Sequence, residues 1–382
     1  MAIHTAKQQS TARTASHVPF FGVDREFAAH REVMLETVAA VLETGKVLQG
    51  EAVKRFETNV AAAAERQQAV AVGSCTDALF FALQAAGIGA GDEVLVTDFS
   101  FIASASCIVR AGATPVFVDV DDSYNLDLER AQSLLSPRSK ALIYVHLYGN
   151  MGDPTRLEAF AKANKLLLIE DSAQAFGAHY QGRPAGSLGQ LSCVSFDPTK
   201  PLSAPGSGGI LLCDDDALAE QLRRLRYHGK DHNGDFPELG YNSQMPSLTA
   251  ALLDFKLQQS PAWTERRRTI AAFYCQELTD LPLQLPHSHA EEASRHIYHK
   301  FVLRSKQRDA LKQHLEHCGV QSMVHYAKPL HQQPYLAAFA HEASYYPNTL
   351  RYASEVLSLP IHPFLHDEEV THVTESVQSF FR

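Results

Sequence analysis

A lysine between two prolines is the residue of this sequence best placed to act as a nucleophile. Lys200 follows the apolar run at residues 192–196 and lies between Pro198 and Pro201. The end of a buried strand and the two prolines should fix its position, and desolvation favours the neutral amine, which is the nucleophilic form of lysine. Most lysines are solvated surface charges, so Lys200 needs chemical partners to act as a catalyst.

Two candidate partners precede Lys200 at the ends of other apolar runs. Residues 73–79 form a turn that leads straight into a helix, where free N–H groups and the positive end of the helix dipole can bind an anion. Capping of that helix by Ser74 or Thr76 is the alternative. Asp171 ends a second apolar run, and a buried carboxylate is costly without a partner such as a protonated heterocyclic nitrogen. A salt bridge or a helix cap would also satisfy Asp171.

An anion site, a buried aspartate and a lysine, in this order, are together what pyridoxal 5'-phosphate (PLP) requires. The helix terminus would take the phosphate, and Lys200 would form the Schiff base. Asp171 would keep the pyridine nitrogen protonated, so that the ring can absorb carbanion electrons. We therefore expect PLP as the cofactor.

Motifs for other cofactors and for metals are incomplete. Residues 87–91 contain half of a dinucleotide-binding glycine pattern, but they follow a helix and precede a strand, which is the reverse of the required order. The six cysteines are scattered and form no CxxC pair, which favours free thiols over disulfides. The pairs His314/His317 and His362/His366 lack a third ligand nearby, so we expect no metal site.

Strands that alternate with helices must position these residues. The strand candidates are apolar throughout, which is typical of strands buried on both faces of a parallel sheet built from βαβ crossovers. The sequence therefore predicts an α/β fold, with helical patterns over 31–64, interrupted at Gly45, and over 76–86. The expected strands are 68–73, 93–97, 115–119, 141–146, 165–171, 192–196 and 209–213.

The chain changes character after residue 263. A long helical stretch through 266–278 is followed by a strand-like run at 299–303, a helix at 307–317 and a terminal helix near 367–381. We expect a large domain at 20–262 with a mostly parallel sheet flanked by helices, and a smaller α+β domain at 263–382. Residues 1–19 are polar without an apolar core, so we expect a disordered tail rather than a secretory signal, with an organelle transit peptide as the alternative.

Composition excludes several classes of partner. The 382 residues include 34 Lys and Arg against 43 Asp and Glu, a net charge of −9, and no dense basic run. Nucleic acid is therefore not an expected partner. No apolar run approaches the ~18 residues that span a bilayer, so we expect no membrane segment and a cytoplasmic location.

From residue 20 to about 381 the chain resembles the DegT/DnrJ/EryC1/StrS sugar aminotransferases, which are fold type I PLP enzymes. Several blocks occur in the family's order, and together they are specific. They are TGKVLQG at 44–50, GDEV at 91–94, GATPVFVD at 112–119, EDSAQ at 170–174, SFDPTK at 195–200, GYNSQM at 240–245, HY at 325–326 and PLH at 329–331.

The resemblance implies a role for each matching residue. Lys200 is the expected catalytic Schiff-base lysine, and Asp171 the expected partner of the pyridinium nitrogen. The other expected cofactor contacts are Gln174 near the phenolic oxygen, Phe101 stacked on the ring, and Thr76, the backbone of Asp77, and Ser195 around the phosphate. Asn242 is expected to reach the phosphate of a neighbouring subunit, which implies a homodimer, and His325, Tyr326 and His331 to line the substrate cleft.

Departures from the family pattern leave the catalytic groups in place. Cys75 stands where glycine or alanine is common, and Gln244 where arginine is common; Asp197 and residues 203–205 are also less usual. Gln244 could change an interface or the mouth of the substrate cleft. A branch that dehydrates sugars has histidine in place of the lysine, so Lys200 favours transamination.

The resemblance implies transfer of an amino group from an amino acid, expected to be L-glutamate, to a keto sugar linked to a uridine or thymidine diphosphate. The amino sugar would serve polysaccharide, lipopolysaccharide or antibiotic biosynthesis. Two alternatives stay open: the same chemistry on a free cyclic ketone such as an inosose, and a non-catalytic PLP-binding regulator.

Overall fold

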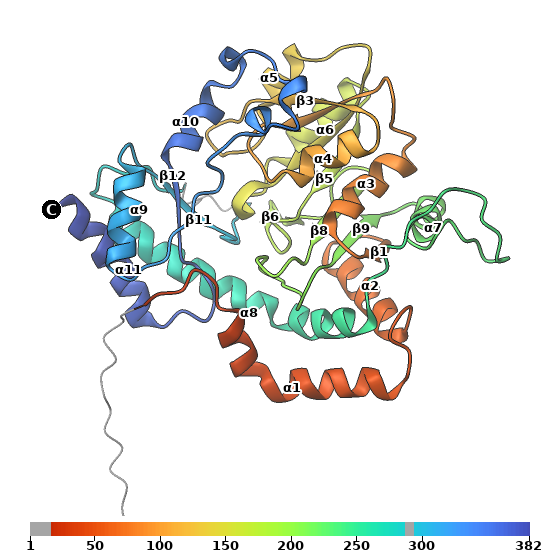
Figure 1. Ribbon diagram of the computed structural model, residues 1–382, viewed down its shortest axis with the longest axis horizontal. Helices are drawn as coiled ribbons and strands as arrows, with labels where there is room; N and C mark the ends of the chain where they lie inside the picture. Colours follow the sequence, from red (N-terminus) through yellow and green to blue (C-terminus); the bar gives the residue numbers. More distant parts are fainter. Residues whose placement is uncertain (1–16, 287–293) are drawn as a thin grey trace, which may run out of the picture.

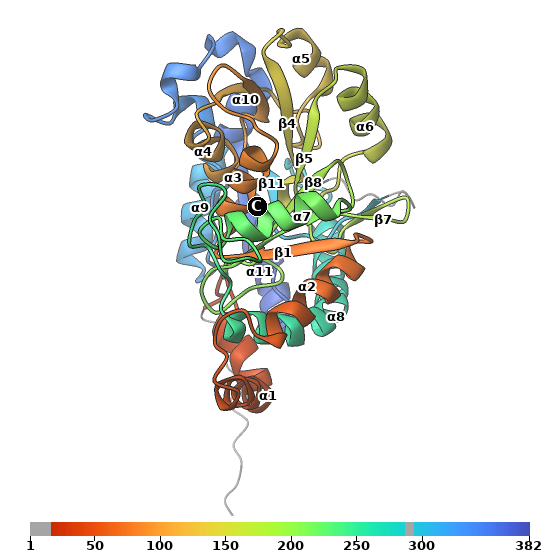
Figure 2. The ribbon, with the colours of Figure 1, turned by 90° about the vertical axis from the view of Figure 1, so that its right-hand side faces the viewer.

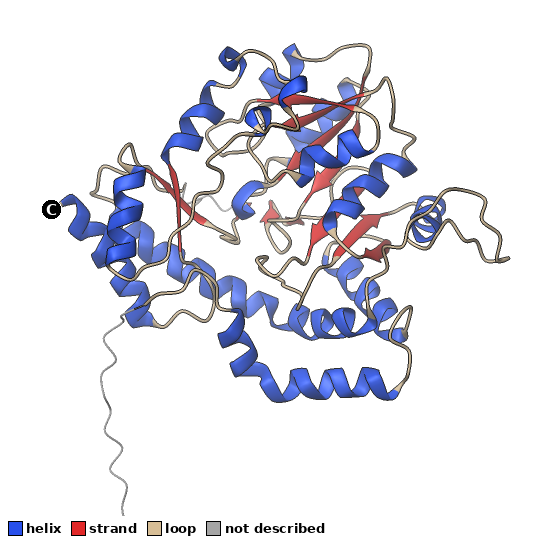
Figure 3. Ribbon diagram, in the orientation of Figure 1, coloured by secondary structure: helices blue, strands red, loops and turns tan. Residues whose placement is uncertain are grey.

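A mostly parallel sheet of seven strands forms the centre of the chain (Figures 1 and 3). The computed structural model describes residues 17–286 and 294–382. The strand order is β1-β9-β8-β5-β4-β2-β3, and β9 alone in this sheet runs against its neighbours. The strands are β1 (Gln68–Val72), β2 (Glu93–Thr97), β3 (Thr114–Val118), β4 (Ser139–Val145), β5 (Leu167–Asp171), β8 (Leu191–Ser195) and β9 (Gly209–Cys213).

Helices cover both faces of this sheet, as its continuously apolar strands require. Figure 2 shows α4 and α6 on opposite sides of β4 and β5. The apolar side chains of α3 (Cys75–Ala85), α4 (Ala103–Arg110) and α7 (Asp216–Leu225) fill one face. Those of α2 (Glu51–Ala63), α5 (Leu128–Ser133), α6 (Pro154–Ala163) and the first half of α8 (Ser247–Leu278) fill the other. The expected α/β architecture is confirmed.

All seven expected strands form, with small differences at their ends. β5 begins at Leu167 rather than at residue 165 because Lys165, just after α6, has a left-handed φ of 55° that ends the helix and precedes the extended backbone. The helical pattern at 31–64 divides into α1 (Val23–Glu43) and α2, and Gly45 adopts a φ of 67° in the turn between them. α1 begins eight residues earlier than the apolar pattern indicates.

A second apolar core lies in the C-terminal part of the chain. β11 (Phe301–Arg304) pairs antiparallel with β12 (Val356–Leu359), and α9 (Arg308–His317), α11 (Asp367–Phe381) and the second half of α8 pack against this pair. The expected strand and helices of this region are present. The remaining elements are α10 (Pro347–Glu355), β6 (His179–Tyr180), β7 (Arg183–Pro184), β10 (Ser294–Arg295) and the 3₁₀ turns η1 (Leu147–Gly149), η2 (Leu330–Gln332), η3 (Ala337–Phe339) and η4 (Ala343–Tyr345).

α8 joins the two cores across the expected domain boundary at residues 262 and 263. Its first half packs with the large sheet, whereas Tyr274 in its second half packs with β11. Two other segments cross this boundary: Val18 is fully buried beside Val320, and Tyr346 belongs to the core of the large sheet. The two halves of α8 thus lie on the expected sides of this boundary. Val18 and Tyr346 instead pack against the part of the chain on the other side of it. Residues 1–16 of the expected tail lie outside the described residues.

None of the described helices has both the length and the apolar character that a membrane-spanning helix needs.

Candidate functional site

The three features expected to bind PLP meet at one edge of the seven-stranded sheet. β5 ends at Asp171 and β8 at Ser195, and these strands pair in parallel with Asp171 opposite Cys193. β1 runs in the same direction, because it is antiparallel to β9, which is antiparallel to β8. The turn after β1 therefore brings the N-terminus of α3 to the edge from which the loop carrying Lys200 leaves β8.

Asp171 is a buried carboxylate without a cationic partner in the described part of the chain. It is 3% exposed, and it accepts hydrogen bonds from Ser104 Oγ (2.9 Å) and from the backbone N–H of Ala173 (3.1 Å). Burial raises the pKa of Asp171, and the bond from Ser104 offsets part of that rise. A protonated ring nitrogen would supply the missing positive charge, so this carboxylate fits the pyridinium nitrogen of PLP.

Lys200 is held as a partly desolvated amine next to this carboxylate. Its backbone N–H donates to the carbonyl of Asp197 (2.9 Å), which closes a tight turn after β8. Burial lowers the pKa of Lys200, and the nearby charge of Asp171 opposes part of that change. The neutral amine is therefore more accessible than in a solvated lysine, as a nucleophile requires.

The N-terminus of α3 offers donors for an anion. Ser74 Oγ caps the helix by accepting the N–H of Asp77 (3.1 Å). The helix cap that the sequence analysis gave as the alternative to an anion site is therefore present. Within the described residues, the N–H groups of Cys75 and Thr76 have no acceptor, and neither has the hydroxyl of Thr76. A Cβ atom on Gly209 would lie 2.4 Å from the nitrogen of Cys75, so a glycine is required for β9 to pass this close to the helix start. These free donors fit a phosphate group.

Asp77 and Ser195 complete the surroundings of that helix start. The N–H of Asp77 is already used by the cap, and its carboxylate accepts Arg110 Nη1 (2.6 Å) and Ser243 Oγ (2.7 Å). This neutralisation matters because a free carboxylate would repel a phosphate. Ser195 Oγ accepts the N–H of Asp197 (3.3 Å) and keeps its own proton to donate.

Gln174 connects the large sheet to the C-terminal part of the chain. It is 3% exposed, its Oε1 accepts the N–H of Tyr148 (3.0 Å), and its Nε2 donates to the hydroxyl of Tyr326 (3.2 Å). Next to Tyr326, His325 Nδ1 contacts Ser358 Oγ at 2.9 Å. Burial, together with the charges of Lys300 and Lys200, lowers the pKa of His325 to about 3, so this ring is neutral.

His331, which the sequence places in the substrate cleft, is not among the residues that line the pocket shared with Lys200, and its role in the cleft stays a prediction. It is 7% exposed, and its Nδ1 pairs with Asp98 Oδ2 at 2.6 Å, while its N–H donates to Asp98 Oδ1 at 2.8 Å. Its ring also stacks on Tyr346 with centroids 4.4 Å apart. These contacts commit the His331 side chain to the packing of the C-terminal segment on the large sheet.

Phe101 and Asn242 are exposed in the single chain. The Phe101 ring is 54% exposed, and its carbonyl accepts the N–H of Ser104 (3.2 Å), the serine whose hydroxyl bonds Asp171. Asn242 Oδ1 accepts Gln244 Nε2 (3.4 Å), and no hydrogen bond joins it to Lys200 in the described part of the chain. The Phe101 ring is thus open to a ligand, while Asn242 faces outward.

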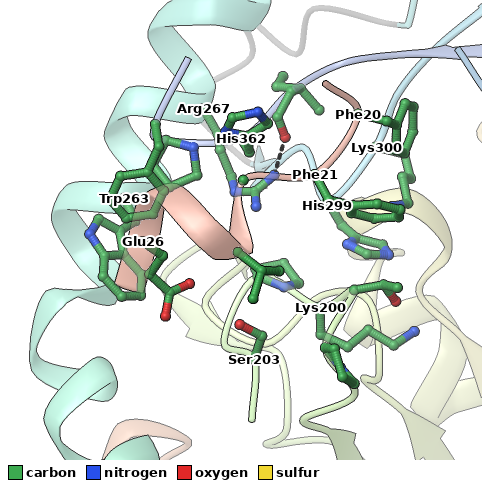
Figure 4. Close-up of a pocket in the computed structure, with 18 residues that line it drawn as sticks. Phe20, Phe21, Glu26, Lys200, Ser203, Trp263, Arg267, His299, Lys300 and His362 are labelled. Carbon is green, nitrogen blue, oxygen red and sulfur yellow. Dashed lines mark hydrogen bonds between the residues drawn. The ribbon is translucent and has the colours of Figure 1, made fainter. Parts of the chain in front are cut away.

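Four further residues around the site escaped the sequence analysis: Ser104, Arg267, His299 and Lys300. Figure 4 shows three of them in a pocket that Lys200 also lines, with His299 and Lys300 on the side of Lys200. The strand-like run at 299–303 begins with a histidine and a lysine, and two basic residues at the start of an apolar strand could have indicated a functional site. Ser104 and Arg267 lie in ordinary helical patterns and gave none.

Comparison with known proteins agrees with this geometry. The model of the DegT/DnrJ/EryC1/StrS aminotransferase family matches residues 29–378. A pleiotropic regulatory protein of Geobacillus stearothermophilus is 38% identical over 96% of this chain and 99% of its own. A UDP-N-acetyl-3-dehydro-alpha-D-glucosamine 3-aminotransferase of Acidithiobacillus ferrooxidans is 37% identical over 94% of this chain and 97% of its own.

A solved structure has the same fold over nearly the whole chain. The crystal structure of DesV from S. venezuelae, in complex with a ketimine intermediate, is 35% identical with a TM-score of 0.93, and the match covers 96% of this chain and 99% of that one. The expected fold type I architecture and the PLP-dependent aminotransferase class are confirmed. The chain belongs to the DegT/DnrJ/EryC1/StrS aminotransferase family.

Proposed function

We propose that the chain transfers an amino group from L-glutamate to a keto sugar linked to a nucleoside diphosphate. The observation that carries this proposal is the desolvated amine of Lys200 beside the unpaired carboxylate of Asp171, at the edge of the sheet where α3 begins. The relative from Acidithiobacillus ferrooxidans is named for amination of a UDP-linked keto sugar, which supports this class of acceptor.

The proposed roles of the residues follow from their surroundings. PLP, when bound, supplies an electron sink that makes the α-proton of an amino acid acidic. Lys200 Nζ takes this proton from the donor's α-carbon, and in the second half of the reaction it delivers a proton to the sugar carbon that gains the amino group. Its lowered pKa suits both transfers, because burial makes the neutral amine, which can accept a proton, more accessible than in a solvated lysine.

The other residues hold the reacting groups in place. Asp171 stabilises a positive charge on the ring nitrogen, and Ser104 fixes the orientation of this carboxylate through the 2.9 Å bond. Thr76, Ser195 and the first N–H groups of α3 bind the phosphate. Gln174 and Tyr326, joined by their hydrogen bond, close the side of the site that faces the C-terminal part of the chain.

The working unit of this proposal is a homodimer in which Asn242 reaches the partner's site. Loop 228–240, between α7 and Asn242, extends away from the rest of the chain in Figure 1. Large apolar side chains are exposed on this loop and close to the site, which is typical of a surface that a second subunit covers. They are Val47, Leu48, Phe101, Phe236 and Leu239. The cytoplasmic location stays a prediction, which cell fractionation would check.

Incubation with defined acceptors tests the proposed reaction. The pyridoxamine phosphate form of the protein would be mixed with UDP- and dTDP-linked keto sugars and with a free inosose, and the products identified by mass spectrometry. Amination of a nucleotide-linked sugar is expected. Amination of the inosose alone would move the substrate class to free cyclic ketones.

A non-catalytic regulator is the second candidate, because a relative that is 38% identical over 96% of this chain is named a pleiotropic regulatory protein. The two candidates differ in their response to an amino donor. A catalyst converts its PLP absorbance to that of pyridoxamine phosphate when L-glutamate is added, whereas a binding protein keeps its absorbance unchanged. Because Lys200 is present and desolvated, we expect the conversion.

A further inference from the structure

A second buried lysine, Lys300, lies in the same pocket as Lys200 without an acidic partner. It is 6% exposed, and within the described residues its ammonium makes neither a hydrogen bond nor an ion pair. It rests against the rings of Phe20 and Phe21, with Nζ 4.9 and 4.8 Å from their centroids. Ring faces stabilise a cation only partly, so a buried ammonium in this setting lacks the anion that would normally offset its desolvation.

The rest of this pocket adds positive charge and free polar atoms. Arg267 is 8% exposed, and among the described residues its side chain bonds only the backbone carbonyls of Ile361 and Tyr298. His299 is 4% exposed, and its Nδ1 has no hydrogen-bond partner in the described part of the chain. The acid on the pocket wall, Glu26, forms an ion pair with Lys256 outside the pocket.

The charges of these groups act on one another. Burial and the charges of Arg267 and Lys200 lower the pKa of Lys300 well below its usual value, and the charge of Asp197, which forms no ion pair with Lys300, opposes only part of that change. Burial and the charge of Lys300 do the same to His299. Four basic side chains, Lys200, Arg267, His299 and Lys300, therefore share a desolvated space whose lining acid, Glu26, is already paired with Lys256, and an anion entering this space would relieve their repulsion.

We propose that this pocket, defined by Phe20, Phe21, Lys200, Arg267, His299 and Lys300, binds the carboxylate of the amino donor, with Lys300 as its main cationic contact. The inference rests on the proposed function and assigns its donor subsite. An amino acid carries its carboxylate one bond away from the carbon whose proton Lys200 takes, so the carboxylate has to lie next to Lys200. Phe20, Arg267, His299 and Lys300 are buried, and this confined part of the pocket suits a compact carboxylate better than a nucleoside diphosphate.

The chain contains its own probe of this pocket. Trp263 is the only tryptophan of the sequence, and it lines the side of the pocket opposite His299 and Lys300 (Figure 4). The fluorescence of Trp263 should therefore report an anion that enters, independently of turnover. Glutarate, a dicarboxylate that has no amino group to transfer, is the ligand of choice for the titration.

The titration uses the holoprotein with glutarate, inorganic phosphate and UDP in parallel, at constant ionic strength. Glutarate is expected to change the Trp263 emission saturably. In Lys300→Met, which keeps the length of the side chain but removes its charge, the Kd for glutarate should rise about tenfold or more, as expected for loss of a hydrogen bond to a charged group. Lys300→Arg should keep most of the affinity. Lys306→Met, a change at an exposed lysine near the same strand, should behave like the unmodified protein.

Three results would overturn the assignment. They are the absence of a saturable response to glutarate in the unmodified protein, an unchanged glutarate Kd in Lys300→Met, and a tighter, Lys300-dependent response to UDP or phosphate. The third would assign the pocket to the acceptor's diphosphate or to free phosphate.

The amination assay separates this inference from the proposed function. If L-glutamate converts the cofactor while glutarate does not bind, the subsite is wrong and the reaction stands. If glutarate binds through Lys300 while no acceptor is aminated, the subsite stands and the proposed acceptor is wrong.

Discussion

Glu170 and Asp171, the last two residues of β5, direct their carboxylates to opposite sides of the strand, and their pKa values shift in opposite directions. Burial alone would raise the pKa of Glu170, but hydrogen bonds led by that from His146 hold it at about 2. Asp171 is equally buried with fewer donors, and burial raises its pKa. The end of β5 thus carries one carboxylate, Glu170, whose charge is stabilised by many hydrogen-bond donors, and a second, Asp171, that has fewer donors.

Glu170, the carboxylate with many donors, has a structural role. Glu170 accepts bonds from the backbone N–H groups of Gly186 and Leu188, both at 2.8 Å, and from Ser192 Oγ at 2.6 Å. His146 Nδ1 accepts the N–H of Gly152 (3.2 Å), so its proton is on Nε2 and is donated to Glu170 (3.0 Å). These bonds fix the end of β5, and thereby the position of Asp171.

Replacement of Lys200 by alanine should abolish transamination while the phosphate donors of α3 still bind the cofactor. The physical reason is that the variant loses the amine that takes the proton from the donor's α-carbon. In the unmodified protein, borohydride reduction should fix the cofactor to a peptide that contains Lys200, as mass spectrometry would show. Attachment to Lys300, the other lysine of the pocket, would contradict the assignment.

Asp171→Asn should slow the conversion of PLP by L-glutamate by several orders of magnitude. The change preserves size and shape but removes the charge that keeps the ring nitrogen protonated, and each thousandfold corresponds to about 4 kcal/mol of activation free energy. Stopped-flow absorbance measures this step directly. A rate close to that of the exposed control Asp280→Asn would mean that Asp171 only serves the structure.

Glu170→Gln should lower stability in a way that depends on pH. Because the pKa of Glu170 is depressed from 4.5 to about 2 in the folded chain, its ionised form contributes stability that is present above pH 4.5 and is lost as the pH falls towards 2. The shift corresponds to about 3 kcal/mol at neutral pH. Urea unfolding should therefore show that Glu170→Gln lowers the free energy of unfolding, relative to the unmodified protein, by a large amount at pH 7 and by a smaller amount at pH 3.5.

The matched control for this change is Glu129→Gln, at an exposed position of α5. It should leave the free energy of unfolding nearly unchanged at both pH values. A Glu170→Gln protein that loses the same stability at both pH values would show that packing, rather than charge, explains the loss.

The sheet and the cofactor residues could be predicted from the sequence because their signals are local. Apolar runs of five residues mark strands buried on both faces, and Asp171 and Lys200 follow such runs directly. β12 was missed: its sequence, Val-Leu-Ser-Leu, is short, and Ser358 interrupts the apolar run.

The donor pocket could not be predicted, because its members come from distant parts of the chain. Phe20 and Phe21 precede Lys300 by 280 and 279 residues, and Arg267 looks like any other charge in a long helix. The contact of His331 with Asp98 also escaped the sequence analysis, because it depends on how the C-terminal segment folds back on the large sheet. Local patterns therefore indicate which residues can do chemistry better than they indicate which of them meet.

Subunit complementation tests whether Asn242 completes the neighbouring site. In the single chain Asn242 is exposed and its side chain accepts a hydrogen bond from Gln244, yet Ser243 next to it bonds Asp77 at the start of α3. The segment thus lies beside the phosphate donors of its own chain while its asparagine faces outward. Lys200→Ala and Asn242→Asp proteins should each be inactive, the second because a new carboxylate would repel the phosphate.

Mixing the two inactive proteins should restore activity if Asn242 acts across the interface. Each mixed dimer then has one site with both changes and one with neither, so random exchange of equal amounts should give about a quarter of the unmodified activity. The control is Lys200→Ala mixed with Asp171→Asn, two changes within one site. Each site of that mixed dimer keeps one defect, so no activity should return. If the Asn242→Asp mixture also stays inactive, although mass spectrometry shows that its subunits exchange, then Asn242 serves the site of its own chain.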